Sequence, residues 1–330
     1  MAQIIATRDL NESASPPALI VAGPTASGKS ALAMELAECC RGTIINADAM
    51  QVYRELCVLT ARPSIEEERR VPHALYGIRP AAEPGSVAWW RGTALAEMDR
   101  ARAAGRLPIL TGGTGLYLAT LIRGLAAIPD PGPAARDEAR RLLKDIGPAA
   151  LHTRLAQADP EAASRLCPTD SQRIARAWEI WRGTGRSLTS WQALAGEPAP
   201  WRFAAILIDP PRGELRAAIA TRLTGMLAEG AIEEVRVLLA LGLDPAVPAM
   251  RAHGVPELTG YLRGAFTLDE ATRRIELVTG QYTKRQATWF RHHQLAEPPW
   301  LHTIHARFAI GEQLSERIVQ DILAFIEHMG

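Results

Sequence analysis

GPTASGKS, residues 23–30, is the stretch that decides the fold of this chain. It matches G-x-x-x-x-G-K-[ST], the P-loop motif of ATP-binding proteins, whose backbone N–H groups cradle phosphates. A buried-strand-like apolar run, residues 18–22, precedes it, and residues 30–40 carry Leu32 and Leu36 on one helical face. A strand, a glycine loop and a helix in that order direct N–H groups and a helix N-terminus at one anion. The sequence therefore predicts a diphosphate or polyphosphate site, and the alternative is a glycine-rich turn without a ligand.

The composition is that of an ordinary globular protein. The chain has 330 residues, of which 47% are hydrophobic and 22% charged, with a formal net charge of +1. A near-neutral total leaves room for a local basic face. The four cysteines have no metal-ligand spacing, which indicates free thiols in a reducing cytoplasm. No apolar run is long enough to span a bilayer, so we expect a cytoplasmic protein without a membrane partner.

Strand and helix patterns alternate in the first third of the chain. Short apolar runs predict strands at 43–46 and 107–110, with a weaker candidate at 74–78, and helical patterns lie at 87–102 and 116–123. This alternation predicts an α/β fold, a P-loop NTPase-like doubly wound parallel sheet. The glycine cluster TGGTG that follows the strand at 107–110 lets backbone approach a ligand closely.

The pattern then changes to helices alone. Between residues 129 and 199 only helical segments occur, and sheet character returns at 203–208. A helical block bracketed by pieces of one α/β domain indicates an insertion whose ends lie close together. We predict a flexible tail at 1–17, a P-loop core formed by 18–128 and 200–330, and an all-helical insertion at 129–199.

Two aspartates follow predicted strands. Asp48 comes after 43–46, and the carboxyl ends of strands border the ligand crevice of open α/β sheets. It is either a turn or capping residue, or a metal ligand or general base beside the phosphates. Asp209 comes after 203–208 and resembles the aspartate that holds magnesium in P-loop NTPases. Because two prolines and a helical pattern follow it, we interpret Asp209 as a helix cap.

Several basic side chains have two possible interpretations. Arg222 lies at the edge of an apolar helical stripe, where it is either a surface residue or a bidentate phosphate ligand. The helix at 171–182 has a polar side with Gln172, Arg173 and Arg176. Its other side carries Ile174, Trp178 and Trp181, which we interpret as core. The last long helix, from a capping box at Thr267 to about residue 293, repeats Arg274, Gln281, Arg285, Thr288 and His292 on one face. That face is either solvated or bound to nucleic acid.

Eight segments in order resemble the isopentenyl-tRNA transferase (tRNA dimethylallyltransferase) family of the bacterial type. They are GPTASGKS (23–30), INADAMQVYR (45–54), Pro72-His73, LTGGTGLY (110–117), DSQRIARAWE (170–179), G-x-L-x3-I-x2-R-L-x2-M-L-x2-G (213–230), MRAHGVPEL (250–258) and YTKRQATWFR (282–291). The resemblance covers about residues 18–293. It implies transfer of a dimethylallyl group from dimethylallyl diphosphate to the exocyclic amine of an adenosine beside the tRNA anticodon, with Mg²⁺ as cofactor. We expect a monomer.

The resemblance also implies roles for particular residues. The diphosphate would be bound by Gly23, Pro24, Thr25, Ala26, Ser27, Gly28, Lys29 and Ser30. Ser30 would hold the Mg²⁺ together with the diphosphate. The catalytic residues would be Asp48 as general base, Thr25 near the bridging oxygen and Arg222 on the diphosphate. The tRNA would contact Asp48, Ala49, Met50, Gln51, Thr114, Gln172, Arg173, Ile174, Ala175, Arg176, Arg251, Ala252, His253, Gly254, Val255, Pro256, Lys284 and Arg285. The insertion would hold the anticodon stem-loop, and the target adenine would be flipped out of the loop.

Some features depart from the family pattern. Ala49 stands where the family usually has serine, and residues 59–63 read LTARP where GTAKP is common. The segment 81–90 is also unusual, and the zinc finger of eukaryotic relatives is absent from the sequence.

Three rival functions share the P-loop. An adenylate isopentenyltransferase would prenylate free AMP, ADP or ATP, but it would need neither the insertion nor the basic face. A small-molecule kinase would use Asp209 on magnesium. An RNA-binding protein with a vestigial P-loop would not need the intact Lys29 and Ser30.

Overall fold

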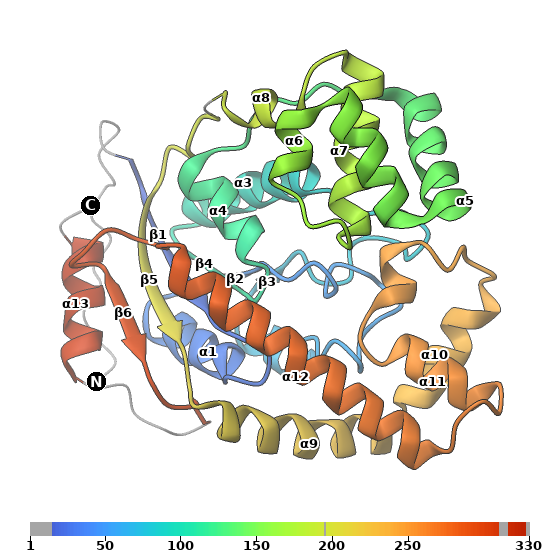
Figure 1. Cartoon of the computed structure of the whole chain (residues 1–330). Helices are drawn as coiled ribbons and strands as arrows, with labels where there is room; N and C mark the ends of the chain where they lie inside the picture. The colour runs from blue at the N-terminus through green and yellow to red at the C-terminus, as the bar shows by residue number, and fades with distance from the viewer. Residues whose placement is uncertain (1–14, 195, 310–315, 328–330) are drawn as a thin grey trace. The chain divides into compact units, whose positions relative to one another are not determined.

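The computed structural model describes residues 15–194, 196–309 and 316–327. Six parallel strands form one sheet in the order β3-β2-β4-β1-β5-β6. The strands are β1 (Pro17–Ala22), β2 (Gly42–Asn46), β3 (His73–Ala74), β4 (Leu107–Gly112), β5 (Arg202–Ile208) and β6 (Leu301–Ile304). The predicted parallel α/β sheet is confirmed, and β1, which leads into the P-loop, lies between β4 and β5 at its centre (Figure 1).

Helices cover both faces of the sheet. They include α1 (Lys29–Cys39), α3 (Val87–Ala103), α4 (Gly115–Arg123) and α13 (Glu316–Glu327), whereas the short α2 (Ile65–Arg70) has no buried residue. Successive residues of a strand point to opposite faces. Leu19 and Val21 pack with α1 and α13, whereas Ile20 packs with α3 and α4. Both faces of β1 are therefore buried, which is why its residues form an unbroken apolar run.

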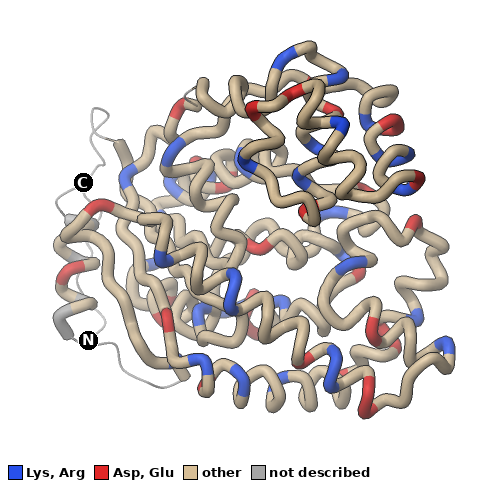
Figure 2. The backbone as a smooth tube through the Cα atoms, in the orientation of Figure 1, with Lys and Arg blue, Asp and Glu red and all other residues tan. Residues whose placement is uncertain are grey.

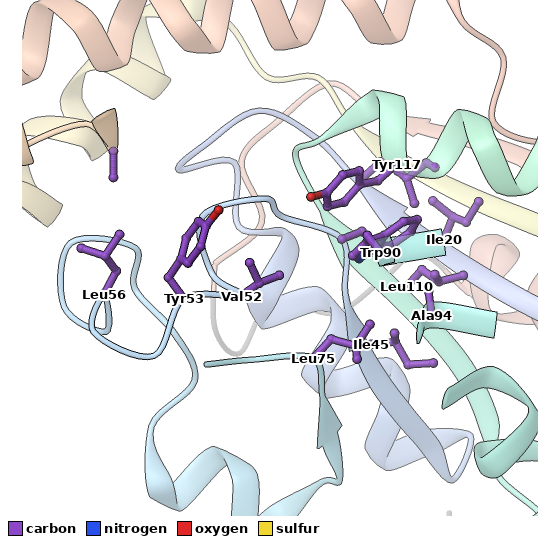
Figure 3. Close-up of a cluster of buried hydrophobic side chains, with 14 of the residues drawn as sticks. Ile20, Ile45, Val52, Tyr53, Leu56, Leu75, Trp90, Ala94, Leu110 and Tyr117 are labelled. Carbon is purple, nitrogen blue, oxygen red and sulfur yellow. The ribbon is translucent and has the colours of Figure 1, made fainter. Parts of the chain in front are cut away.

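Of the two hydrophobic clusters that flank the sheet, the one that contains Ile20 is the larger and extends beyond the sheet (Figure 3). Trp90 of α3 is fully buried and stacks on Tyr117 of α4, with ring centroids 4.4 Å apart. Its indole N–H donates to the carbonyl of Asn46 at the end of β2, at 2.8 Å. Val52 and Leu56 of the loop after β2 belong to the same cluster. Burial of such large side chains stabilises the fold by about 1.5–3 kcal/mol each and fixes the loop against the sheet.

Two strands differ from the expectation. β3 has two residues where a strand at 74–78 was predicted, because Leu75 adopts a left-handed φ of 68° that ends the pairing. β6 was not predicted at all. It lies at the edge of the sheet and is only partly buried, so its sequence LHTI shows neither an apolar run nor a clear alternation.

The chain after β5 is helical until β6. It forms α9 (Arg212–Ala228), α10 (Ala231–Ala240), the 3-10 helix η1 (Pro248–Arg251), α11 (Val255–Leu262) and α12 (Leu268–His292). The long α12 lies along α9 (Figure 1). At the start of α12, the Thr267 hydroxyl accepts the Glu270 N–H at 3.2 Å. The Glu270 carboxylate contacts Arg273 and Arg274.

The interpretation of Asp209 as a helix cap is wrong. α9 begins at Arg212, its N-cap is Pro211, and no side chain caps it. Pro211 is extended, with φ −54° and ψ 141°, which moves the helix start away from Asp209. The Asp209 carboxylate instead accepts a hydrogen bond from Arg291 Nε at 3.3 Å.

The chain divides into two compact units, Met1–Ile122 with Ala199–Gly330, and Arg123–Pro198. The second unit contains only helices among its described residues: α5 (Gly132–Ala158), α6 (Pro160–Ser164), α7 (Ser171–Thr184) and α8 (Leu188–Gln192). α5 is kinked at Gly147, whose φ of 76° and ψ of 170° are not helical. Ile174 and Trp178 of α7 are buried in this unit, so the core interpretation of that side is confirmed.

The predicted tail, residues 1–17, lies mostly outside the described residues, and Pro17 already belongs to β1. None of the described helices combines the length and the apolar character that a membrane crossing requires.

Candidate active site

The P-loop lies between β1 and α1. Gly28 at the N-terminus of α1 has a left-handed φ of 96°, and no side chain caps the helix. A Cβ at Gly28 would collide with the backbone carbonyl of Phe308, so only glycine fits there. The first N–H groups of α1 are thus available to an anion, as the sequence motif predicts. Ser27 adds a fully buried hydroxyl without a hydrogen-bond partner among the described residues.

Gln286 of α12 joins the two glycine segments. Its Oε1 accepts the Thr25 N–H at 2.9 Å and the Thr25 hydroxyl at 3.2 Å. Its Nε2 donates to the Gly113 carbonyl at 3.0 Å. Only 4% of Gln286 is exposed, and a Cβ at Gly113 would collide with Nε2. This side chain therefore fixes the distance between the P-loop and the TGGTG segment, a role that the sequence pattern did not predict.

The segment after β6 holds the other side of the P-loop. Phe308 N donates to the Ser27 carbonyl at 3.0 Å, and Arg307 Nε donates to the Ala26 carbonyl at 2.9 Å. Ala26 has a φ of 66°, an uncommon conformation for a residue with a side chain. Contacts on both sides therefore hold the loop in a strained shape before any ligand arrives.

Asp48 follows β2 in a short polar turn. Its Oδ1 accepts the Met50 N–H at 2.9 Å, and its own N–H donates to Asn46 Oδ1 at 2.8 Å. The Thr114 hydroxyl accepts the Ala49 N–H at 3.0 Å. The turn interpretation and the site interpretation are therefore compatible. The turn fixes the carboxylate, and Thr114 ties it to the glycine segment.

Three charges from distant parts of the chain influence one another here. Burial lowers the pKa of Lys29 from 10.5 to about 8, while the charge of Asp48 raises it and that of Arg222 lowers it. Burial also lowers the pKa of Arg222, and Asp48 opposes this shift. Such mutual effects require proximity in a poorly solvated region. Arg222 is only partly exposed and its charge acts on Lys29, so it is not the freely exposed surface residue that its stripe-edge position also allowed.

Several aromatic and imidazole side chains lie within electrostatic range of Asp48. Burial, and next the charge of Asp48, raises the pKa of Tyr282 to about 12. Burial likewise raises the pKa of Tyr76 and of Tyr117, with smaller contributions from Asp48. Burial lowers the pKa of His253, whose ring packs edge-on against Tyr282 at 4.9 Å. These groups stay neutral near pH 7, so the carboxylate lies among weakly polar walls.

The pKa of Lys29 predicts that binding of a phosphate ligand at the P-loop depends on pH. In the free protein a pKa of about 8 leaves Lys29 about 10% protonated at pH 9, and a bound polyanion restores its charge. We therefore expect Lys29 to take up protons when dimethylallyl diphosphate binds: about 0.9 protons per ligand at pH 9 and about 0.1 at pH 7. Its terminal phosphate, with a pKa of about 6, is already ionised.

Calorimetry in buffers of different ionisation enthalpy measures this uptake. Lys29→Met should lose it, because the titrating group is gone. Equal proton uptake by Lys29→Met and the unmodified protein would assign the titration to another group.

The predicted tRNA-contacting residues divide by exposure. Exposed side chains include Gln172, Arg173, Arg176, Arg251, Pro256, Lys284 and Arg285. Buried ones are Ile174, Ala252, Gly254 and Val255, which support the segments from inside. Asp48, Ala49, Met50, Gln51, Thr114, Ala175 and His253 are intermediate. The four buried residues could touch the tRNA directly only through their backbone atoms.

The basic face of α12 is only partly available. Its first cations, Arg273 and Arg274, both pair with Glu270 in the first turn of the helix. Further along, the exposed Lys284 lines a small cavity with Arg212, Arg216 and Arg291 of the α9–α12 groove. The Lys and Arg positions recur along both helices (Figure 2). The C-terminal half of α12 therefore offers the positive surface.

Comparison with known proteins agrees with this geometry. The sequence matches the family described as IPP transferase over residues 51–293 and that described as isopentenyl transferase over residues 17–74. The chain belongs to the IPP transferase family. A relative of this family, the tRNA dimethylallyltransferase of Granulibacter bethesdensis, is 60% identical over 94% of this chain and 97% of its own length. That of Gluconacetobacter diazotrophicus is 59% identical over 94% of both chains.

Solved structures of IPP transferases have the same fold. The tRNA isopentenylpyrophosphate transferase of Bacillus halodurans is 31% identical, with a TM-score of 0.65 over 96% of both chains. A eukaryotic dimethylallyltransferase acting on tRNA reaches a TM-score of 0.70 over 83% of this chain and 70% of its own, at 24% identity. The second comparison supports the fold alone.

Proposed function

We propose that this chain transfers a dimethylallyl group from dimethylallyl diphosphate to N6 of the adenosine on the 3′ side of the anticodon, in tRNAs that read codons beginning with U. The observations that carry the proposal are the charges of Lys29, Asp48 and Arg222, which act on one another in a poorly solvated region, and the Gln286 side chain, which joins the P-loop to the TGGTG segment. Two cations and a free helix N-terminus suit a diphosphate, and a carboxylate among neutral walls suits a proton acceptor. The names of the close relatives support the same reaction.

The residues divide the reaction between them. The N–H groups at the start of α1, with Lys29 and Arg222, hold the diphosphate, and Thr25 lies at its bridging oxygen. The amine nitrogen attacks the allylic carbon, the carbon–oxygen bond breaks, and its electron pair leaves with the diphosphate. Asp48 accepts the amine proton. An adenine amine is a poor nucleophile, so proton removal and charge neutralisation on the leaving group must act together.

The chain provides one ligand for a magnesium ion at this site. Ser30 is exposed at the uncapped start of α1, and no cluster of three or more His, Cys, Asp or Glu side chains suited to a metal occurs in the described part of the chain. This fits Mg²⁺, which commonly takes one or two protein ligands and the phosphate oxygens. When bound, the ion would supply positive charge to the departing diphosphate.

The acceptor is a folded RNA and not a mononucleotide. The exposed cations of the segment at 251–256 and of the C-terminal half of α12 suit a phosphate backbone. On α7, Arg173 and Arg176 are exposed too, but they pair with Asp170 and Glu179. On this proposal the unit Arg123–Pro198 holds the anticodon stem-loop and the target adenine is flipped toward Asp48. We expect the protein to work as a monomer in the cytoplasm, where tRNA is modified.

Transfer of label tests the proposal. Purified protein is incubated with magnesium and radiolabelled dimethylallyl diphosphate in two separate reactions, one with unmodified tRNA and one with AMP as the acceptor. Label on the tRNA alone supports the proposal, and label on AMP would move the chain to the adenylate isopentenyltransferases. No label on either, with ATP consumed against a small alcohol, would indicate a kinase.

Arg285 should contribute to tRNA affinity through its charge. It is exposed, and none of the ion pairs among the described residues involves it. We expect Arg285→Ala to weaken tRNA binding and to reduce the slope of log K against log salt by about 0.7–0.9, the value of one phosphate contact. Filter binding between 50 and 200 mM salt, about the range where such contacts are lost, measures the slope.

Arg273→Ala is the matched control, because Arg273 lies on the same helix and is already paired with Glu270. An unchanged slope in Arg285→Ala would remove Arg285 from the phosphate contacts.

A further inference from the structure

A glutamate that is not one of the three charges Lys29, Asp48 and Arg222 holds the loop that follows Asp48. Glu234 of α10 accepts three consecutive backbone N–H groups: Cys57 at 2.6 Å, Val58 at 2.7 Å and Leu59 at 2.9 Å. A carboxylate that accepts several N–H groups makes strong, charge-assisted hydrogen bonds. Residues 57–61, here called the pinned loop, belong to no helix or strand. The hydrogen bonds from Glu234 therefore anchor a segment that regular secondary structure does not hold.

The pinned loop in turn orients the guanidinium of Arg222. The Thr60 carbonyl accepts a hydrogen bond from Arg222 Nη2 at 3.2 Å. A neutral carbonyl fixes the direction of the planar fork without cancelling its charge, whereas a carboxylate would compete with a diphosphate. No ion pair among the described residues involves Arg222, so its charge is kept for a ligand.

Both predicted tRNA segments near Asp48 touch the same loop. Gln51 Nε2 donates to the carbonyls of Thr60 and Ala61, each at 3.0 Å. On the other side, a Cβ added to Gly254 would lie 2.8 Å from the Leu59 side chain, and Gly254 has a φ of 99°. The pinned loop therefore supports three parts of the proposed site: Arg222, which would bind the diphosphate, and the segments of Gln51 and Gly254, which would contact the tRNA.

We propose that Glu234 is a positioning residue for the transfer reaction, acting through the Thr60 carbonyl on Arg222. It fixes where the guanidinium meets the diphosphate and does not touch the substrate itself. This inference rests on the proposed function, which assigns the diphosphate to Arg222. Sequence patterns give no sign of it, because the link passes through backbone atoms.

A double-mutant cycle tests the link. The affinity for dimethylallyl diphosphate with magnesium is measured by calorimetry for Glu234→Gln, Arg222→Gln and the double variant. Glutamine has one acceptor, and its NH₂ would face N–H groups, so we expect about a tenfold loss of affinity for Glu234→Gln. In the Arg222→Gln background the same change should cost less than about twofold, because residues acting through one another are not additive.

Glu233→Gln is the control on the same helix, since Glu233 is exposed and pairs only with Arg236 among the described residues. It should keep full affinity. If Glu234→Gln does not fold, Glu234→Asp carries the same cycle, with a loss of about two- to fivefold that vanishes in the Arg222→Gln background. Full affinity in the Glu234 variant, or an equal loss in both backgrounds, would overturn the inference. An unmodified protein that does not bind the diphosphate would overturn the proposed function as well.

Discussion

Replacement of Asp48 by asparagine is expected to lower turnover by about 10³-fold while the affinity for dimethylallyl diphosphate stays within a few-fold of normal. Asparagine has nearly the same shape, and its carbonyl oxygen can still accept the Met50 N–H that fixes the turn. It cannot take a proton from the adenine amine. Single-turnover transfer to tRNA, measured beside diphosphate binding, separates the two effects.

Asp209→Asn is the matched control for this result. Asp209 also follows a strand, but its carboxylate pairs with Arg291 and lies in the α9–α12 cavity. Transfer to tRNA should persist in this variant. A kinase would show the opposite order, with Asp209 essential and Asp48 dispensable, and full turnover in Asp48→Asn would falsify the general-base assignment.

Replacement of Gln286 by leucine should damage both stability and donor binding. The change removes three hydrogen bonds and leaves the Thr25 N–H and the Gly113 carbonyl without their partner in a buried place. An unsatisfied buried group costs about 1–3 kcal/mol, so we expect the free energy of unfolding to fall by about 2–4 kcal/mol. The affinity for dimethylallyl diphosphate should fall at least about tenfold, because the P-loop loses its fixed distance to the TGGTG segment.

Two variants refine the Gln286 result. Gln281→Leu lies on the same helix but is exposed, and should leave stability and affinity unchanged. Gln286→Glu keeps the acceptor for Thr25 but sets a carboxylate oxygen against the Gly113 carbonyl. It should therefore be intermediate or worse, and normal diphosphate affinity in Gln286→Leu would show that the bridge does not position the P-loop.

The elements that the sequence predicted well are those with strong local signals. β1, β2, β4 and β5 are buried on both faces and appear as apolar runs, and α9 and α12 show long apolar stripes. The weak points are places where tertiary contacts decide. β6 exists because the edge of β5 offers it partners, and β3 is cut short by the backbone of Leu75.

The candidate site follows the same rule. The P-loop and Asp48 could be located because their positions follow from motif and strand order. Gln286 was missed because a polar residue in a basic helix by itself resembles a surface residue. The signal that could have found it is its spacing from Thr283, Ala287 and Phe290, which lie with it on the buried side of α12. The Thr60 carbonyl could not be found at all, since a backbone acceptor leaves no trace in side-chain patterns.

The sheet order also sets when the protein can finish folding during synthesis. The central strand β1 pairs with β4, which is complete at residue 112, and with β5, which is complete only at residue 208. At about 5–20 residues per second, the ribosome needs about 5–20 s to add the residues between them. The helical unit Arg123–Pro198 emerges in that interval and can form its own core first. The P-loop gains its backbone partner Phe308 only after β5 and α12 have been made, so a nascent chain that ends before residue 308 cannot present a finished phosphate site.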